Sequence, residues 1–501
     1  MMTLARVSRF LAELFTTLFK GLLRSRVAVA GAVVSSLVLP VLFISILLDM
    51  HGDVNNPYFG FVIYMVMGPL FVAGLVTVVV GLLFFRDKEE IGLYALEYIR
   101  EQMTMPGRFI RVRRLIYLSS FITLFTLLVI GVVSYAGFNY TESVKFCGQF
   151  CHTVMEPEYI TYQNSAHSRV SCVDCHIGGS AGGFTKSKIS GIKMIFATFF
   201  GRFSRPITTP ISSLRPTREV CEKCHRPEKF HGDKLYVKDA YLPDEANTHV
   251  QTVLLMRVGS GGYRGQVAQG IHWHVSPQHS VSFQEDPTRP DVIQRIKMVD
   301  HDGSVVLYQR GADQDKAKER PNYRLMDCLD CHNRPTHVFL SPDEALDNKI
   351  ATGVIPLLPY VKKLGLELVQ RPYTDKEQAR QLIAEGAEEW YRRNYPEQFR
   401  TSARLVTKAG AGIFQAWSEN VFPGMNISWR SYASRIGHRD EKGCFRCHAE
   451  GLVSREGRAV SNDCNLCHVV LADRQPSPDI MRILQGAKAL GENAHANQVI
   501  K

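Results

Sequence analysis

Three long apolar runs lie in the first third of the chain, at residues 27–48, 59–85 and 115–137. None of them contains a charged side chain, and at about 1.5 Å of rise per residue each is long enough to cross a bilayer as a helix. A cleavable signal peptide has one short apolar stretch followed by a cleavage site. The pattern therefore predicts a permanent anchor of three transmembrane helices over residues 27–137.

The lysines and arginines next to these runs predict the orientation of the anchor. Residues 1–26 carry five of them and residues 86–114 carry seven, whereas residues 51–58 carry none. Because basic loops stay in the cytoplasm, we expect residues 1–26 to be a basic amphipathic lead-in at the cytoplasmic surface of a bacterial inner membrane. Everything after the third run is then expected in the periplasm.

Beyond the anchor the apolar pattern becomes shorter. Residues 189–200 predict an amphipathic helix that lies either at the membrane surface or packed inside the protein. Alternating runs then predict a small β-rich insert at residues 233–310, with a hairpin that turns at Asp302-Gly303. The predicted strands cover residues 250–258, 271–275, 280–283, 292–299 and 304–309.

Residues 341–435 are predicted to form a helical spacer. Segments 341–344 and 374–377 have the Ser/Thr-x-x-Glu spacing of a capping box at a helix start. Residues 378–393 follow with a helical apolar period. The last residues, 474–501, contain no motif and are expected to form a tail or a short docking helix.

Cysteine usage points to the chemistry. All 12 cysteines fall in six motifs, and a histidine directly follows the second cysteine of each one. Five motifs have the spacing C-x-x-C-H, and the first has one extra residue. This spacing allows two thioether bonds to the vinyl groups of one haem, while the histidine ligates the iron. The motifs, numbered one to six, are Cys147/Cys151/His152, Cys172/Cys175/His176, Cys221/Cys224/His225, Cys328/Cys331/His332, Cys444/Cys447/His448 and Cys464/Cys467/His468.

Other uses of these cysteines fit less well. Zinc ribbons also pair C-x-x-C units but need no histidine after each one, and no cysteine is left over for a disulfide. The sequence therefore predicts a c-type cytochrome with six haems, whose function is electron transfer. The apolar runs contain no histidine, so we expect no haem inside the membrane. The net charge of +11 partly reflects the basic cytoplasmic segments, and the chain has no nucleic-acid motif.

A haem iron needs a second axial ligand, and the remaining histidines supply candidates. Of 17 histidines, six belong to the motifs, so five haems with two histidines each would use five of the other eleven. We consider His438, which precedes motif five, His249, and the pair His272 and His274. That pair would share one face of a strand, and we expect only one of the two to be a ligand. The reserve candidates are His231, His279 and His301.

Two stretches carry a family resemblance. They are Cys151-His-Thr-Val-Met155-Glu-Pro-Glu-Tyr-Ile-Thr-Tyr162-Gln-Asn-Ser-Ala-His167, followed by motif two, and Cys328-Leu-Asp-Cys331-His332-Asn-Arg-Pro-Thr-His337. Through them, residues 138–340 resemble the NapC/NirT (NrfH-type) family of membrane-anchored tetrahaem quinol dehydrogenases. With three spans, a β-rich insert and extra C-terminal haems, the chain looks like the inner-membrane multihaem cytochromes of metal-reducing bacteria.

The resemblance implies roles for particular ligands. His167 would be the distal ligand of the motif-four haem, and His337 that of the motif-two haem. Met155 lies one residue further from the motif histidine than the family's methionine ligand, and it is the candidate ligand of the first haem. A methionine or an open position raises the potential of a haem relative to two histidines, which suits the first electron acceptor.

The resemblance also implies a quinol site beside the first haem. The family's lysine, about a dozen residues past the second motif, corresponds to Lys188, with Lys186 close by. The family's acidic partner is missing, because residues 177–218 contain no carboxylate. Glu156 or Glu158 would take its place as proton acceptor.

Together these features predict a membrane-anchored, mainly α protein whose periplasmic haem region has little regular structure. Menaquinol would be oxidised at the periplasmic face, and electrons would pass through residues 138–340 to a dihaem unit at residues 436–473. Periplasmic multihaem cytochromes or a reductase would receive them, in anaerobic respiration. The alternatives are quinone reduction by the reverse reaction, terminal reduction of a nitrogen or sulfur oxyanion, and a haem scaffold that anchors a partner. A homo-oligomer is left open.

Overall fold

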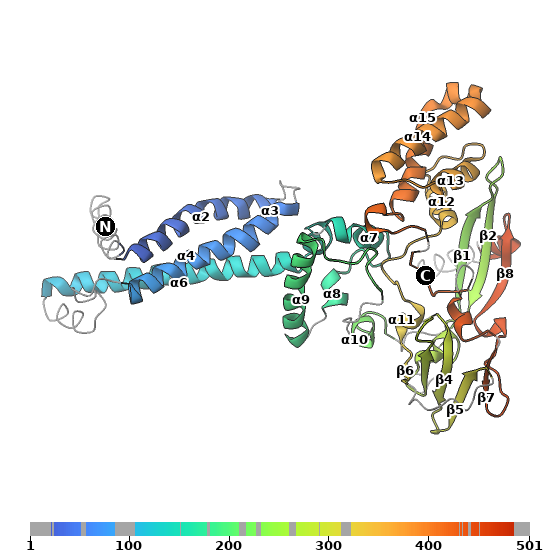
Figure 1. Ribbon diagram of the computed structural model, residues 1–501, viewed down its shortest axis with the longest axis horizontal. Coiled ribbons are helices and arrows are strands. Elements are labelled where there is room, and N and C mark those ends of the chain that lie inside the picture. Colours follow the sequence, from blue (N-terminus) through green and yellow to red (C-terminus); the bar gives the residue numbers. More distant parts are fainter. Residues whose placement is uncertain are drawn as a thin grey trace, which may run out of the picture. The chain divides into compact units, whose positions relative to one another are not determined.

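The computed structural model of the chain forms two compact units, Met1–His152 and Thr153–Lys501. Figure 1 shows the long helices of the first unit and the mixture of helices and sheets in the second. The residues that the structure describes are 22, 25–51, 57–85, 106–150, 152–177, 181–209, 217–226, 232–259, 267–289, 291–311, 322–429, 431–432, 434–438, 442–449 and 451–484. Most of the predicted lead-in and of the predicted tail lies outside these residues.

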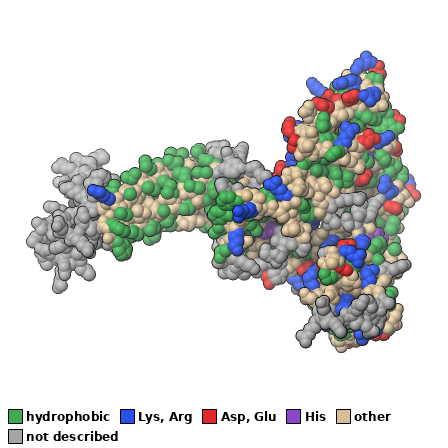
Figure 2. Space-filling view, viewed as in Figure 1, with side chains coloured by type: hydrophobic (Ala, Val, Ile, Leu, Met, Phe, Trp, Pro, Cys, Tyr) green, Lys and Arg blue, Asp and Glu red, His purple; other side chains and the backbone are tan. Residues whose placement is uncertain are grey.

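The first unit consists mainly of apolar helices. They are α2 (Arg26–His51), α3 (Pro57–Phe61), the π-helix η1 (Val62–Met67), α4 (Gly68–Phe84), α6 (Pro106–Thr141) and the π-helix η2 (Phe146–Phe150). Three stretches are long and apolar enough to cross a membrane, at Arg26–Ile46, Phe59–Gly81 and Ser120–Thr141. The predicted three apolar helices are thus confirmed. Figure 2 shows hydrophobic side chains over their surface, as expected for helices that face lipid.

Small residues let α2 and α4 pack closely. A Cβ on Gly31 would lie 2.6 Å from the carbonyl oxygen of Gly74, and a Cβ on Gly81 would lie 2.4 Å from the backbone nitrogen of Ala28. Lipid tails are as apolar as leucine, so close packing of this kind holds membrane helices together in place of the hydrophobic effect. The buried centre of the unit is formed by Leu42, Ile63, Tyr64, Phe71 and Val133.

Short helices carry the haem motifs of the second unit. They are α8 (Cys172–His176), α10 (Thr217–Cys221), α11 (Cys328–Cys331) and the 3-10 helices η7 (Gly443–Arg446) and η8 (Cys464–Leu466). α7 (His152–Gln163) precedes motif two and α9 (Ala181–Phe199) follows it. Ile189, Ile192, Met194 and Phe196 of α9 are 56% to 61% exposed, so burial of this helix inside the protein is wrong. The exposed apolar face favours the alternative at the membrane surface.

Two antiparallel sheets contain the predicted insert. One has the strand order β1-β2-β8 and the other β6-β3-β4-β5-β7. The predicted hairpin is confirmed as β4 and β5, with Gly303 at φ +82° in its turn. β7 and β8 come from the C-terminal part of the chain, so both sheets extend beyond the insert. The strands are β1 (Lys234–Tyr241), β2 (His249–Met256), β3 (Ser280–Glu285), β4 (Ile293–Val299), β5 (Val305–Arg310), β6 (Arg324–Leu325), β7 (Leu452–Ser454) and β8 (His468–Gln475).

The predicted strand at residues 271–275 is wrong, because this segment is the 3-10 helix η5 (Ile271–Val275). Gly270 precedes it at φ +68°, and a Cβ there would lie 2.5 Å from the carbonyl oxygen of Arg257. Glycine tolerates this conformation and turns the chain away from an extended path. His272 and His274 therefore do not share one face of a strand.

The helical spacer is formed by α12 (Pro342–Ala351), α13 (Val361–Val369), α14 (Lys376–Asn394) and α15 (Pro396–Ser418). The capping box at Ser341 and Glu344 is confirmed, as is the helix at residues 378–393. The second capping box is wrong, because Asp375 caps α14 by accepting a hydrogen bond from the Gln378 N–H at 2.8 Å. Carboxylates are strong N-caps, so the aspartate takes this position in place of the preceding threonine. The core is built around Leu368, Ile383, Tyr391 and Trp417.

A fully buried lysine ties this spacer together. The Nζ of Lys362 lies 2.7 Å from Asp347 Oδ1 and donates to the Asp343 carbonyl at 2.8 Å. Burial raises the pKa of the Asp347 carboxyl, and the charge of Lys362 opposes that shift. Asn247, just before β2, bonds the backbone of both Leu358 and Lys362. The ion pair thus lies where the spacer meets the first sheet.

We expect Lys362→Met to destabilise the spacer by about 3–5 kcal/mol, because Asp347 would keep a buried charge without its cation. Hydrogen exchange of the α12–α15 amides, measured on the full chain, should become faster. Lys363→Met, which removes the exposed neighbouring lysine, should leave this exchange unchanged. Equal exchange in both variants would contradict the structural role given to Lys362.

Candidate haem sites

The described cysteine pairs have the local geometry that thioether attachment needs. In motifs three, four and five, the backbone N–H of the histidine donates to the carbonyl of the first cysteine at 2.8–3.0 Å. One such turn brings residues i and i+3 to the same side, so both thiols point to one region of space. None of the eleven described cysteines forms a disulfide. Among the described residues, no group of three or more His, Cys, Asp or Glu is arranged as a metal site.

Two cysteines are less enclosed than their predicted role suggests. Cys224 of motif three and Cys464 of motif six are exposed, whereas the other nine described cysteines are partly buried. α10 ends at Cys221, and Cys224 follows in a turn, where its N–H donates to the Cys221 carbonyl at 3.2 Å. Because the helix has already ended, the protein by itself does not enclose this thiol. Thioether attachment at Cys224 therefore stays a prediction that rests on the spacing of motif three.

Four motif histidines face a histidine from another segment. The pairs, with the distance between ring centroids, are His176 and His337 (6.4 Å), His225 and His167 (5.9 Å), His448 and His274 (5.7 Å), and His468 and His438 (6.0 Å). A metal–imidazole bond is about 2 Å long, so two histidines on opposite sides of one iron have ring centroids roughly 6 Å apart. The centroid separations of all four pairs are close to this value.

η5 contributes histidines to two different motifs. His274 Nε2 lies 3.4 Å from His448 Nε2 of motif five. Burial lowers the pKa of His272, and the neighbouring His332 of motif four lowers it further. We therefore propose that both η5 histidines are distal ligands, one for each motif, where the sequence led us to expect only one.

Two other predicted ligands occupy positions that change their assignment. The ring of His167 faces motif three, with its Nδ1 3.2 Å from the Pro335 carbonyl oxygen, so we propose motif three for it in place of motif four. His249 on β2 lies 2.7 Å from Asp239 Oδ1, on an exposed part of the first sheet. No motif histidine contacts His249 in the described part of the chain, so we no longer propose it as a ligand.

Motif one stays a prediction. Cys151 lies outside the described residues, and so does the side chain of His152. Cys147 lies in η2, and Met155 lies on α7. Met155 as the axial ligand of the first haem therefore stays a prediction that rests on the family resemblance.

Burial favours the neutral state that a ligand needs in several of the candidate histidines. It lowers the pKa of His176, His272, His274 and His332, and it lowers the pKa of His337 to about 4. A neutral imidazole has a lone pair for the metal, whereas a protonated one has none. These rings are thus ready to ligate iron at neutral pH.

Motifs two to six lie next to one another in chain order. The thiols of Cys221 in motif three and Cys328 in motif four share a hydrogen bond. Burial and the nearby Cys224 thiol of motif three both raise the pKa of Cys175 in motif two. Burial and the two thiols of motif five likewise raise the pKa of Cys331 in motif four. The Cys444 thiol of motif five has the same effect on Cys467 of motif six. The five attachment sites form an unbroken series, and together with the paired neutral histidines they fit haem c.

Glu158, a predicted proton acceptor for quinol, is buried beside a histidine pair. Its Oε2 lies 3.1 Å from His337 Nδ1 and 3.7 Å from Arg334 Nη1, and the side chain is only 14% exposed. Burial raises the pKa of the carboxyl, while Arg334 and His176 lower it. Because the Glu158 carboxylate is enclosed by these groups, we no longer propose it as the acceptor. The other candidate, Glu156, is half exposed and lies 2.8 Å from Lys376 Nζ.

Comparison with known proteins identifies the family of the chain. Residues 112–209 match the NapC/NirT cytochrome c family, N-terminal region. The chain is 34% identical over 462 residues to the cytochrome c-type protein ImcH of Geobacter sulfurreducens, an alignment that covers 91% of this chain and 89% of ImcH. The chain belongs to the NapC/NirT cytochrome c family. It is therefore a membrane multihaem c-type cytochrome involved in electron transfer, and the resemblance seen in its motifs is confirmed.

Two further relatives of the NapC/NirT family match shorter segments. The cytochrome c-type protein NapC of Haemophilus influenzae is 34% identical over 82 residues, which are 14% of this chain and 40% of NapC. The cytochrome c nitrite reductase subunit NrfH of Nitratidesulfovibrio vulgaris is 29% identical over 101 residues, which are 19% of this chain and 62% of NrfH. No solved structure matches the chain significantly.

We expect His272→Ala and His274→Ala each to convert one haem from low spin to high spin, because each removes one axial ligand. The two variants should affect different haems, and the double variant should affect two, measured by electron paramagnetic resonance. Added imidazole should restore the low-spin signal. His279→Ala is the matched control, because the ring of His279 stacks on Trp273 with 3.9 Å between the ring centroids. This variant should change no spin state. A single affected haem in the double variant would contradict the assignment.

Proposed function

We propose that this cytochrome oxidises menaquinol at the periplasmic face of the inner membrane and passes the electrons to periplasmic cytochromes or a reductase. Each quinol gives up two electrons and two protons. Haem c, when bound at the six motifs, supplies one-electron carriers. The proposal is supported by membership of the NapC/NirT family and, above all, by a groove in the apolar unit close to motif one.

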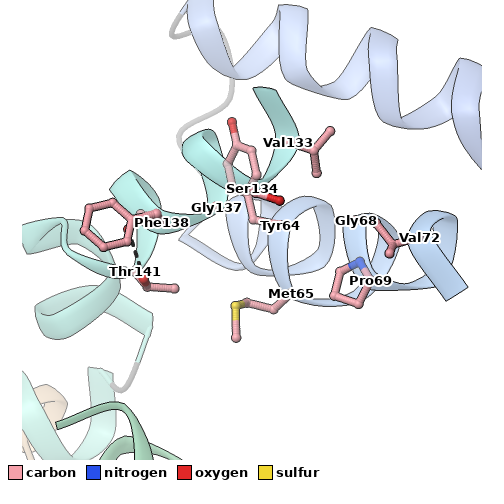
Figure 3. Close-up of a pocket in the computed structure, with 10 residues that line it drawn as sticks. All are labelled: Tyr64, Met65, Gly68, Pro69, Val72, Val133, Ser134, Gly137, Phe138 and Thr141. Atoms are coloured by element: carbon pink, nitrogen blue, oxygen red, sulfur yellow. Dashed lines mark hydrogen bonds between the residues drawn. The ribbon is translucent and has the colours of Figure 1, made fainter. Parts of the chain in front are cut away.

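The groove lies between the second and third candidate spans. Its volume is about 400 Å³, and Figure 3 shows its lining residues, which come from η1 and α4 on one side and from α6 on the other. The lining is mostly apolar, with the hydroxyl groups of Ser134 and Thr141 at its α6 side. An apolar cleft with a few polar groups is the usual form of a small-molecule site. This lining suits a quinol ring with a long apolar tail.

Aromatic side chains connect the groove to motif one. Tyr64, which lines the groove, lies 5.3 Å from the ring of Tyr140, and Tyr140 lies 5.4 Å from Phe146. Phe146 stacks with Phe150 at 5.5 Å, and these two residues flank Cys147 in η2. A π-helical segment such as η1 often marks a functional site. A quinol in the groove would thus be a few side chains from the first attachment site.

A lipid acyl chain or a helix of a second copy would also fill the apolar part of the groove, and the Thr141 hydroxyl already donates to the Phe138 carbonyl at 2.9 Å. The choice of quinol rests on membership of the NapC/NirT family and on the nearness of the groove to motif one. We therefore propose quinol as the occupant and treat lipid and self-association as outcomes of the test below.

Gly137→Leu is expected to slow haem reduction by a menaquinol analogue roughly tenfold, which corresponds to about 1.4 kcal/mol of transition-state stabilisation. A Cβ on Gly137 would lie an ordinary 3.7 Å from the Tyr64 Cβ, so position 137 accepts a side chain, and we expect leucine there to occupy the groove. The rate is measured by absorbance on the detergent-purified holoprotein under anaerobic conditions. Dithionite should still reduce every haem in the variant.

Gly131→Leu is the matched control, because Gly131 lies on the same helix and a Cβ there meets nothing within 4 Å. It should reduce at the wild-type rate. If Gly137→Leu also keeps the wild-type rate, the groove holds lipid or a second chain and the site is wrong. If the wild-type protein itself is not reduced by quinol, the proposed direction of electron flow is wrong.

Lys188→Ala is expected to slow the same reaction, because the family resemblance gives this lysine a role in taking up the quinol proton. Lys188 and Lys186 lie on α9, and their side chains are outside the described part of the structure. Lys193→Ala, further along the same helix, is the control for loss of one positive charge. Equal rates in the two variants would remove the specific role of Lys188.

A further inference from the structure

A buried ion pair lies beside the histidine pair of motif two. Glu158 on α7 and Arg334, two residues after motif four, have side chains that are 14% and 9% exposed, and their charged atoms are 3.7 Å apart. The guanidinium of Arg334 also lies 3.6 Å from the ring centroid of Tyr432. Burying two charges costs desolvation free energy. The hydrophobic effect therefore does not explain why these two side chains are buried.

The glutamate reaches His337 through two different groups. The Nδ1 of His337 lies 2.9 Å from the main-chain oxygen of Glu158 and 3.1 Å from its Oε2. If Nε2 ligates the iron, Nδ1 carries the proton and donates a hydrogen bond to the main-chain oxygen of Glu158. The backbone thus orients the ring, while the carboxylate adds a negative charge beside it. Arg334 donates to the His337 carbonyl at 3.1 Å, which fixes the same residue from the other side.

We propose that Glu158 is a positioning residue that lowers the reduction potential of the motif-two haem relative to the other haems. A carboxylate beside the outer nitrogen of a ligating histidine makes the imidazole a stronger electron donor. A stronger donor and a nearby negative charge both stabilise the more positively charged, oxidised iron. Arg334 partly offsets this charge and keeps the carboxylate in place. The inference rests on ligation by His337 and not on the oxidation of quinol.

The test is a spectroelectrochemical titration of the full-length holoprotein. In Glu158→Gln we expect one haem to become roughly tenfold easier to reduce at a given potential, which is about 59 mV for a one-electron couple. The haem content and the low-spin spectrum should stay unchanged, because the main-chain oxygen still orients His337. Glu158→Asp keeps the charge and should recover part of the shift.

Glu156→Gln is the matched control. Glu156 lies two residues earlier on the same helix, is 44% exposed and pairs with Lys376. Its loss removes the same charge from a position where water screens it, so the potentials should not move.

Three results would overturn the proposal. They are unchanged potentials in Glu158→Gln, a high-spin haem in that variant, and an equal shift in Glu156→Gln. The premise has its own test, because His337→Ala should make the motif-two haem high spin. A haem that stays low spin in His337→Ala would show that the ligand assignment failed, whatever the result with quinol.

Discussion

An iron bound by two histidines requires two imidazole rings that face each other with about 4 Å between their nitrogens. Most of the second unit can be understood from this constraint. The motif histidine is fixed in sequence, but its partner must approach from the opposite side of the haem, so it comes from a different segment. His337, from the stretch after motif four, faces motif two, and His274 of η5 faces motif five. A haem bound between two such histidines would hold together parts of the chain that are distant in sequence.

Burial has two separate consequences at these sites. It lowers the pKa of His176, His274 and His337, which favours the neutral ring that a ligand needs. It also strengthens any charge that is enclosed with them, because water no longer screens it. The Glu158–Arg334 pair is such a charge pair, and it lies beside motif two. Differences in buried charge can therefore give chemically identical haems different potentials.

The apolar unit and the helical spacer are stabilised by different forces. In the apolar unit, glycines such as Gly31 and Gly74 allow close helix contacts, because lipid provides no hydrophobic drive for association. The spacer has a conventional core around Trp417 and Tyr391, and the fully buried Lys362 lies where it meets the first sheet. The haem region needs less of either, since bound haem itself is a large apolar group. This division explains why the sequence is hydrophobic at its start and rather polar around the motifs.

The sequence alone determined the features that depend on local pattern. Uninterrupted apolar runs gave the three helices, and the Asp302-Gly303 turn gave the β4–β5 hairpin. The spacing of cysteine and histidine likewise predicts the attachment sites. Tertiary structure decided which histidines meet. It placed His167 against motif three and gave His272 and His274 separate neighbours, because Gly270 turns η5 out of the extended path that alternation had suggested. Pairing across a haem depends on contacts between distant segments, and no local pattern in the sequence encodes it.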